Sequence, residues 1–251
     1  VRSDRGVDVL KGRLSMPTAS PFVWAVRGMN AERVLASPSG TTLTAGGRLV
    51  PIYVPPSALK YELPSAGRPE VAFCGRSNAG KSTLIGALFG DASLVRTSKA
   101  PGCTTSLNFY ALSPAGGSRA ARYFLVDMPG YGFAQRAKEA TRQWTRAVTG
   151  YLLGRESSVL RRTFVLVDAR RGIGGSDAAM MRLLDDAGVP YQVVLTKADQ
   201  LQPWEATRAA EAAMHVVVNH PACLPVLHLV SGRDGRGVRE LLDTIHYIIG
   251  T

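Results

Sequence analysis

The sequence predicts an α/β protein with a mostly parallel six-stranded sheet, one antiparallel edge strand, helices on both faces and a basic irregular N-terminal extension. From residue 70 onward, short β-branched segments alternate with longer amphipathic ones, which is typical of strands followed by helices. Several short segments, such as Phe164-Val165-Leu166-Val167, are apolar without alternation, as strands buried on both faces require. With 251 residues and 45% apolar composition, the chain can bury a core of its own.

The predicted elements follow one another in a regular order. Strands are expected at residues 71–75, 106–112, 122–127, 163–168, 192–196 and 226–230. Helices are expected at residues 81–89, 134–153, 177–187, 204–217 and 238–249. A short loop with Pro114, Gly116 and Gly117 joins the second and third strands, which predicts a hairpin and therefore one antiparallel strand.

Residues 1–60 differ from the rest and are expected to form an extension to a folded domain at residues 61–251. They hold eight basic residues against three acids, are rich in Ser, Pro and Gly, and show no sustained period. Three roles stay open: a transit peptide for an organelle, a flexible linker, or an arm that binds RNA. The basic, Ser-rich composition favours the mitochondrial matrix, with a bacterial cytoplasm or a plastid as alternatives.

Composition and charge exclude several classes of protein. The net charge of +11 indicates a polyanionic partner. Three scattered cysteines argue against a disulfide scaffold, and the four histidines lack the Cys pairs of a structural zinc site. No apolar run approaches the roughly 20 residues that span a bilayer. We therefore expect a protein of a reducing compartment that does not act in a membrane.

A phosphate-binding loop is expected between the first strand and the first helix. The segment 75–82 reads Gly-Arg-Ser-Asn-Ala-Gly-Lys-Ser, in which glycines let backbone N–H groups approach phosphate oxygens at a helix N-terminus. Lys81 is expected to reach the β- and γ-phosphates and Ser82 to ligate Mg²⁺. The predicted nucleotide-binding residues of this segment are Gly75, Arg76, Ser77, Asn78, Ala79, Gly80, Lys81, Ser82 and Thr83.

A second segment, Thr196-Lys197-Ala198-Asp199, follows a predicted strand at the same sheet edge and is expected to select guanine over adenine. The Asp199 carboxylate can accept hydrogen bonds from guanine N1–H and the N2 amine, a pair of donors that adenine lacks. The Lys197 stem can lie over the base, and Thr196 can tie this loop to the phosphate loop. After the last strand, the segment Ser231-Gly232-Arg233 could offer backbone N–H groups to guanine O6, with Ser231 and Gly232 as the predicted binding residues.

A third segment, Asp127-Met128-Pro129-Gly130, is expected to sense the γ-phosphate. Asp127 would hold Mg²⁺ through water, and the Gly130 N–H would contact the γ-phosphate. The aperiodic segment 97–105 lies between this turn and the phosphate loop. Within it, Thr104 is the predicted Mg²⁺ ligand and γ-phosphate sensor, with Thr105 as second choice.

In order and spacing, these motifs resemble the EngB family of ribosome-biogenesis GTPases. The resemblance runs from about residue 62 to 249 and is most specific in Leu-Asn-Phe-Tyr at 107–110 and in the Asp-Met-Pro-Gly-Tyr-Gly run at 127–132. It implies a Ras-like P-loop GTPase domain, GTP or GDP with Mg²⁺, and weak hydrolysis. It also implies a monomer that assembles the large ribosomal subunit through precursor rRNA and ribosomal proteins. Cys103 and the Ser231-Gly232-Arg233 loop depart from the family pattern.

Hydrolysis is expected to be slow, with Lys81, Thr104 and Gly130 as its catalytic residues. Tyr131 stands where many small GTPases carry the glutamine that orients the attacking water. Asn78 resembles the asparagine that ligates K⁺ in potassium-stimulated relatives. We therefore hypothesise that K⁺ or the ribosome stimulates hydrolysis.

Two other functions stay open from the sequence. One is a nucleotide-binding scaffold of a ribosomal particle with negligible turnover. The other is a P-loop ATPase unrelated to ribosomes, in which Asp199 would not set the base preference.

Overall fold

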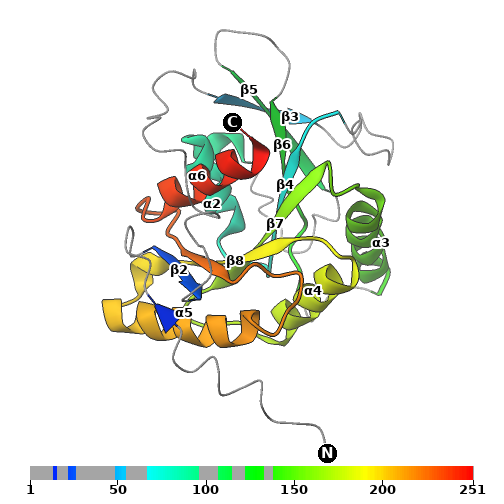
Figure 1. Ribbon diagram of the computed structural model, residues 1–251. Coiled ribbons are helices and arrows are strands. Elements are labelled where there is room, and N and C mark those ends of the chain that lie inside the picture. Colours follow the sequence, from blue (N-terminus) through cyan, green and yellow to red (C-terminus); the bar gives the residue numbers. More distant parts are fainter. Residues whose placement is uncertain are drawn as a thin grey trace, which may run out of the picture.

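A nine-stranded sheet forms the centre of the molecule, with strand order β1-β2-β9-β8-β7-β4-β6-β5-β3 (Figure 1). The computed structural model describes residues 14–15, 22–26, 49–54, 67–95, 107–114, 122–132 and 138–250. The strands are β1 (Leu14–Ser15), β2 (Val23–Val26), β3 (Leu49–Val54), β4 (Glu70–Gly75), β5 (Asn108–Pro114), β6 (Tyr123–Asp127), β7 (Leu160–Asp168), β8 (Tyr191–Thr196) and β9 (Val226–Leu229).

The six strands predicted from residue 70 onward are confirmed as β4 to β9. Strands β6, β4, β7, β8 and β9 run parallel to one another, and β5 pairs antiparallel with β6. All six residues of β4 and all six of β8 are buried. This burial agrees with the unbroken apolar runs, because helices cover both faces of these strands.

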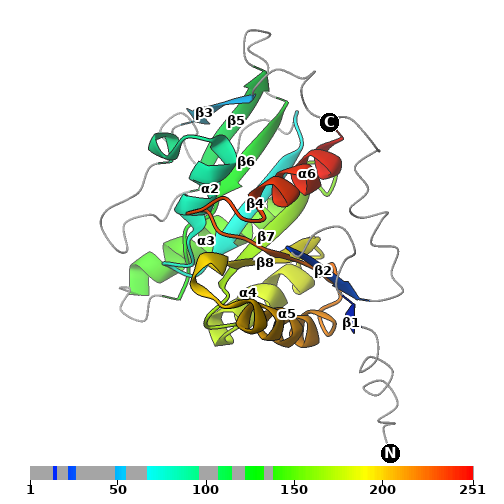
Figure 2. The ribbon, with the colours of Figure 1, turned by 90° about the vertical axis from the view of Figure 1, so that its left-hand side faces the viewer.

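In the described part of the chain, five α-helices cover the sheet close to their predicted bounds: α2 (Lys81–Phe89), α3 (Lys138–Gly154), α4 (Gly175–Asp186), α5 (Pro203–Val217) and α6 (Val238–Ile249). Side chains of α2 and α6, including Leu84 and Leu241, pack on one face of the sheet. Side chains of α3, α4 and α5, including Val148, Met181 and Met214, pack on the other face (Figure 2). Among the residues that the structure describes, no helix is both long and apolar enough to span a membrane.

The segment expected to be irregular contributes three short strands to this sheet. Strand β2 pairs antiparallel with β9, and β3 pairs antiparallel with β5, so β5 is not the edge strand. These pairings depend on backbone hydrogen bonds along a sheet edge, which leave little trace in a sequence pattern. Pro51 is tolerated within β3 because an edge strand needs no N–H on its outer side.

The parallel register brings the carboxyl ends of four strands to one edge. Phe73 of β4 lies opposite Asp127 of β6, and Asp168 of β7 lies opposite Thr196 of β8. Loops leaving these strands therefore meet at that edge, where ligands bind in open α/β sheets.

A buried ionic cluster ties the start of β4 to the end of α3. Glu70 is fully buried, and its carboxylate accepts a hydrogen bond from the Tyr151 hydroxyl (2.8 Å). Arg155 pairs with the same carboxylate at 2.9 Å. Burial raises the pKa of Glu70 above its usual range, although Arg155 and Tyr151 act against that shift.

We predict that Arg155→Met lowers the free energy of unfolding by about 3–5 kcal/mol near pH 7, because it leaves Glu70 buried without its cation. Without Arg155 the folded-state pKa of Glu70 rises further, so the protonated carboxyl is favoured and the deficit grows as pH rises from 5 to 8. Urea unfolding across this pH range measures both effects. Arg161→Met, at an exposed position nearby, serves as the control and should change stability little. A loss of unfolding free energy that does not change with pH would contradict the role of Arg155 as the cation that keeps Glu70 ionised.

Candidate nucleotide-binding site

The loop after β4 has the backbone conformation of a phosphate cradle. A Cβ on Gly75 would lie 2.9 Å from the Leu166 carbonyl oxygen, so the loop leaves the sheet in close contact with β7. Asn78 and Gly80 both adopt positive φ (68° and 88°), and α2 begins directly after Gly80 at Lys81. Backbone N–H groups in such a loop, followed by a helix N-terminus, form a concave site for anions.

The turn after β6 lies directly against this loop. Ser77 N donates to Tyr131 O (3.0 Å), and Tyr131 N donates to Gly75 O (3.3 Å). A Cβ on Gly130 would lie 2.9 Å from the Ser77 hydroxyl oxygen, which explains why this position holds glycine. The buried Asp127 carboxylate forms an ion pair with the Lys81 ammonium. The cation and the carboxylate expected to handle phosphate and Mg²⁺ therefore meet at one place.

Two side chains anchor the same turn to the helices beside it. The Tyr131 hydroxyl donates to Asp177 (2.9 Å) at the start of α4, and the other Asp177 oxygen accepts from Gly174 N (2.9 Å). The Trp144 indole of α3 donates to Pro129 O (2.8 Å) and packs edge-on against the Tyr131 ring. Burial raises the pKa of the Tyr131 phenol well above its usual range, so it stays protonated. Asp177 carried no sequence signal beyond its place near a helix start.

The loop after β8 is tied to the phosphate loop by two side chains. The Thr196 hydroxyl donates to Ala79 O at 2.6 Å, which is the tie predicted from the sequence. The Lys197 ammonium contacts Asn78 O (2.6 Å) and Asp168 (2.9 Å).

Asp168 is a site residue that the sequence did not single out. It ends β7 and also pairs with Arg170 at 2.6 Å. Although burial opposes ionisation, hydrogen bonds from Arg170 and Lys197 hold the pKa of Asp168 well below its usual range. Its place in the sequence could have indicated this, because Asp168 ends a buried strand at the same sheet edge as the other motifs.

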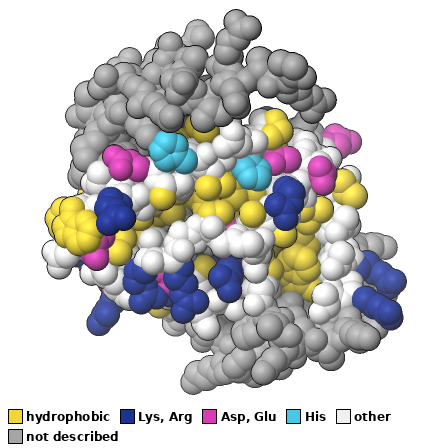
Figure 3. All heavy atoms as spheres, turned by 90° about the horizontal axis from the view of Figure 1, so that it is seen from below, with side chains coloured by type: hydrophobic (Ala, Val, Ile, Leu, Met, Phe, Trp, Pro, Cys, Tyr) yellow, Lys and Arg dark blue, Asp and Glu magenta, His cyan; other side chains and the backbone are white. Residues whose placement is uncertain are grey.

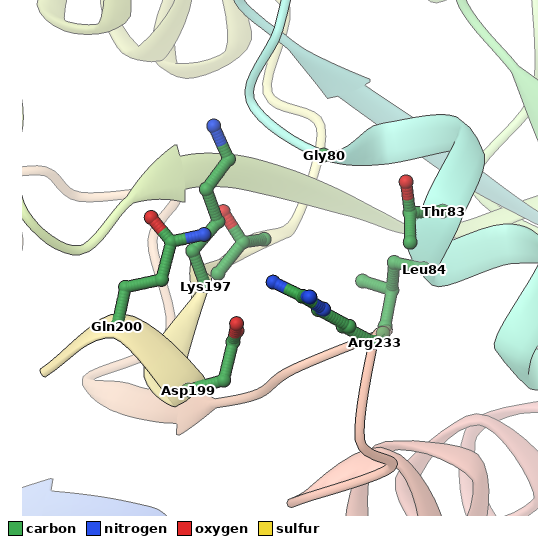
Figure 4. Close-up of a pocket in the computed structure, with 9 residues that line it drawn as sticks. Gly80, Thr83, Leu84, Lys197, Asp199, Gln200 and Arg233 are labelled. Carbon is green, nitrogen blue, oxygen red and sulfur yellow. The ribbon is translucent and has the colours of Figure 1, made fainter.

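A cavity of about 190 Å³ lies between the loop after β8, α2 and the loop after β9 (Figure 4). It is lined by Gly80, Thr83, Leu84, Thr196, Lys197, Asp199, Gln200, Gly232 and Arg233. The Asp199 carboxylate accepts a hydrogen bond from the Ser231 hydroxyl (2.9 Å), which fixes its orientation. The Asp199 carboxylate, a hydrogen-bond acceptor, therefore lies in a cavity beside the phosphate loop. Leu84 and Gln200 were not predicted to line this cavity, and Arg233 was expected to contribute only through its backbone.

Ser82 lies in the first turn of α2, directly after Lys81. The candidate Mg²⁺ ligand Thr104 lies outside the described residues. Within the described ranges, no group of three or more His, Cys, Asp or Glu side chains forms a metal cluster. Mg²⁺ at nucleotide sites commonly takes only one or two protein oxygens together with phosphates. The Ser82 hydroxyl and the Asp127 carboxylate are oxygen donors of this kind, so the residues fit the ion.

Comparison with known proteins agrees with the geometry. Residues 70–197 match a family described as 50S ribosome-binding GTPase. The probable GTP-binding protein EngB of Cereibacter sphaeroides is 44% identical over 188 residues, which cover 75% of this chain and 82% of that protein. The protein of the same name from Nitrobacter hamburgensis is 45% identical over 188 residues, covering 75% and 83%.

Two solved structures share the fold. A crystal structure of a probable GTP-binding protein engB aligns with a TM-score of 0.51 and 22% identity, covering 72% of this chain and 98% of that one. Era, in complex with MgGDPNP and nucleotides 1506–1542 of 16S ribosomal RNA, aligns with a TM-score of 0.57 and 22% identity, covering 72% and 56%. At these identities the likeness concerns the fold alone.

We predict that Thr196→Val raises the dissociation constant of GDP about fivefold, because it removes the hydrogen bond that holds the base loop to Ala79. Titration with a fluorescent GDP derivative measures the change. Thr163→Val is the matched control, because the buried Thr163 hydroxyl has no hydrogen-bond partner within the described part of the chain. The control should bind GDP like the wild type. Equal effects of both substitutions would contradict the proposed tie.

Proposed function

Because this chain belongs to the EngB family of GTP-binding proteins, we propose that it hydrolyses GTP to GDP and phosphate and uses this cycle to assemble the large ribosomal subunit. The observation that carries the nucleotide part is the Asp199 carboxylate, fixed by Ser231 in a cavity next to the phosphate loop. The family description, a 50S ribosome-binding GTPase, supports the ribosomal part.

The proposed roles follow from where the charged groups lie. Lys81 binds the β- and γ-phosphates, and the Gly130 N–H contacts the γ-phosphate. Ser82 and Asp127, with Thr104, hold Mg²⁺, which neutralises charge that develops on the phosphates during transfer. The N–H groups from Gly75 to Thr83 surround the phosphates, and Lys197 covers the base.

The surroundings of Tyr131 support the proposal that intrinsic GTP hydrolysis is slow. Tyr131 is only 6% exposed, and its hydroxyl is engaged with Asp177, so it cannot orient the attacking water. We propose that K⁺ held by the exposed Asn78, or a group supplied by the ribosome, provides the missing stabilisation. Either would place positive charge near the β- and γ-phosphates.

The proposed partner is a large-subunit precursor, contacted through rRNA phosphates and ribosomal proteins. The charge of +11 supports an anionic partner. Figure 3 shows Lys and Arg side chains on both sides of the face seen from below, with several of them close together at its lower left. We propose that the protein is a monomer away from the ribosome and that no membrane takes part.

The proposed division at residue 60 is modified by strands β1 to β3. A transit peptide that is cut off cannot supply strands to a folded sheet, so the pairing of β2 and β3 favours retention of residues 22–54. The basic composition of residues 1–60 supports the mitochondrial matrix, while the relatives named above come from bacteria and are compatible with a bacterial cytoplasm. A plastid is the third proposed location.

The main alternative is a nucleotide-binding scaffold of a ribosomal particle with negligible turnover. We predict instead that single-turnover GTP hydrolysis by the purified protein is faster in K⁺ than in Na⁺, or faster with large-subunit precursors than without them. Lys81→Ala is the control and should reduce hydrolysis to background. Tight GTP binding without turnover in any of these conditions would support the scaffold.

An ATPase is disfavoured by the position of Asp199. We predict that Asp199→Asn weakens GDP binding at least tenfold while leaving the weak binding of ADP unchanged, because only guanine donates two hydrogen bonds to this carboxylate. Competition titrations of both diphosphates measure the ratio. An unchanged preference would show that another group selects the base.

A further inference from the structure

The guanine base presents two edges that a binding site can read. Asp199 can accept from N1–H and the N2 amine on one edge. The adjacent edge carries two acceptors, O6 and N7, which require donors from the protein. The hydrogen-bond donors that surround the cavity of Figure 4 therefore decide whether this second edge can be read.

Several of these donors already have partners inside the protein. The Thr196 hydroxyl donates a hydrogen bond to Ala79 O, and the Ser231 N–H donates one to Arg236 O at 2.9 Å. The N–H groups of Arg233 and Asp234 both point to the Ser231 hydroxyl oxygen, at 3.2 and 3.3 Å. The backbone donors expected to serve O6 are therefore largely engaged, with only Gly232 N left in the turn.

Three side-chain donors at the cavity have no such partner among the described residues: the Arg233 guanidinium, the Gln200 amide and the Thr83 hydroxyl. Of these, the guanidinium alone carries a positive charge and two parallel N–H groups. Within the described part of the chain, it makes no hydrogen bond or ion pair, although it lines the cavity. Figure 4 shows it reaching from the loop after β9 into the cavity, toward the side where Lys197 and Asp199 lie. A planar guanidinium presents two parallel N–H groups, and this fork matches the O6 and N7 acceptors of guanine.

The backbone before Arg233 is held firmly, which fixes where its side chain begins. A Cβ on Gly232 would lie 2.9 Å from Leu84 N and Cα, so the loop is pressed against the first turn of α2. The turn is closed by Gly235 N donating to Ser231 O at 3.0 Å. Ser231 thus orients Asp199 through its hydroxyl and positions Arg233 through the same turn.

We propose that Arg233 donates its guanidinium to the O6/N7 edge of the bound guanine, as a second base-reading contact beside Asp199. This inference rests on guanine-nucleotide binding by the chain but not on hydrolysis or on ribosome binding. Arg233 also disfavours adenine, whose 6-amino group would point its hydrogens at the guanidinium.

The test compares GDP with 7-deaza-GDP, which lacks the N7 acceptor, and 6-thio-GDP, which weakens the acceptor at position 6. Arg233→Ala is expected to raise the dissociation constant of GDP about tenfold. The wild type should bind at least one of the two analogues more weakly than GDP, and this difference in dissociation constant should be smaller in Arg233→Ala. The preference for GDP over ADP should fall by a similar factor, and Arg233→Lys should give an intermediate loss.

Two controls share the neighbourhood. Arg236→Ala removes one positive charge from the same turn, where the Arg236 side chain pairs with Asp234 at 2.7 Å, and should change the GDP dissociation constant less than about twofold. Gln200→Ala removes the side-chain amide of a second residue that lines the cavity. In this variant, 7-deaza-GDP and 6-thio-GDP should remain weaker than GDP by the same factors as in the wild type.

The proposal is overturned if Arg233→Ala binds GDP like the wild type, or if it weakens all three diphosphates by the same factor. It is also overturned if Gln200→Ala, rather than Arg233→Ala, removes the difference in dissociation constant between GDP and these analogues. These measurements use diphosphates, so a wild-type protein that binds GDP but does not turn over GTP would contradict only the proposed hydrolysis.

Discussion

The nucleotide site depends on two hydrogen bonds that join the phosphate loop to the base loop. Ala79 O accepts from Thr196, and Asn78 O accepts from Lys197, both at 2.6 Å. Because a trans peptide directs its carbonyl and its N–H to opposite sides, the Ala79 carbonyl held by Thr196 turns the Gly80 N–H away from the base loop. The positive φ values at Asn78 and Gly80 make this arrangement possible. The loop proposed to bind phosphate and the loop proposed to read the base are therefore joined, and we expect a disturbance of one loop to affect the other.

The turn after β6 is fixed differently, by contacts with two helices. Its backbone pairs with the phosphate loop, while Tyr131 reaches Asp177 at the start of α4 and Trp144 of α3 holds Pro129 O. A movement at Gly130 would therefore strain or shift contacts to α3 and α4, and such contacts can carry a local change to a distant surface. The same contacts support the proposal that Tyr131 takes no part in the hydrolysis of GTP.

Much of this could be predicted from the sequence, because strand and helix periods and the three motifs are local signals. The β4–α2 turn, the Thr196 tie and the cavity beside Asp199 follow from such signals. The partners of those residues could not be predicted. Asp168 and Asp177 act through contacts between distant strands and helices, and an Asp at a strand end or helix start has many uses. Strands β2 and β3 were missed because edge pairing depends on an available neighbour rather than on a pattern.

These edge strands bear on the base-reading loop itself. Leu229, the last residue of β9, donates its N–H to Phe22 O at 2.8 Å, and the chain enters the Ser231 turn two residues later. Gly237 closes the other side of that turn at φ 67°, where a Cβ would lie 2.2 Å from Leu229 O and 3.2 Å from the Phe22 side chain. Phe22 and β2 thus lie against β9, the strand that leads into the turn with Ser231 and Arg233. A segment whose composition suggests a separate arm completes the edge of the sheet that carries the base-reading loop, so residues 22–26 belong to the nucleotide-binding domain in structure, whatever else the extension does.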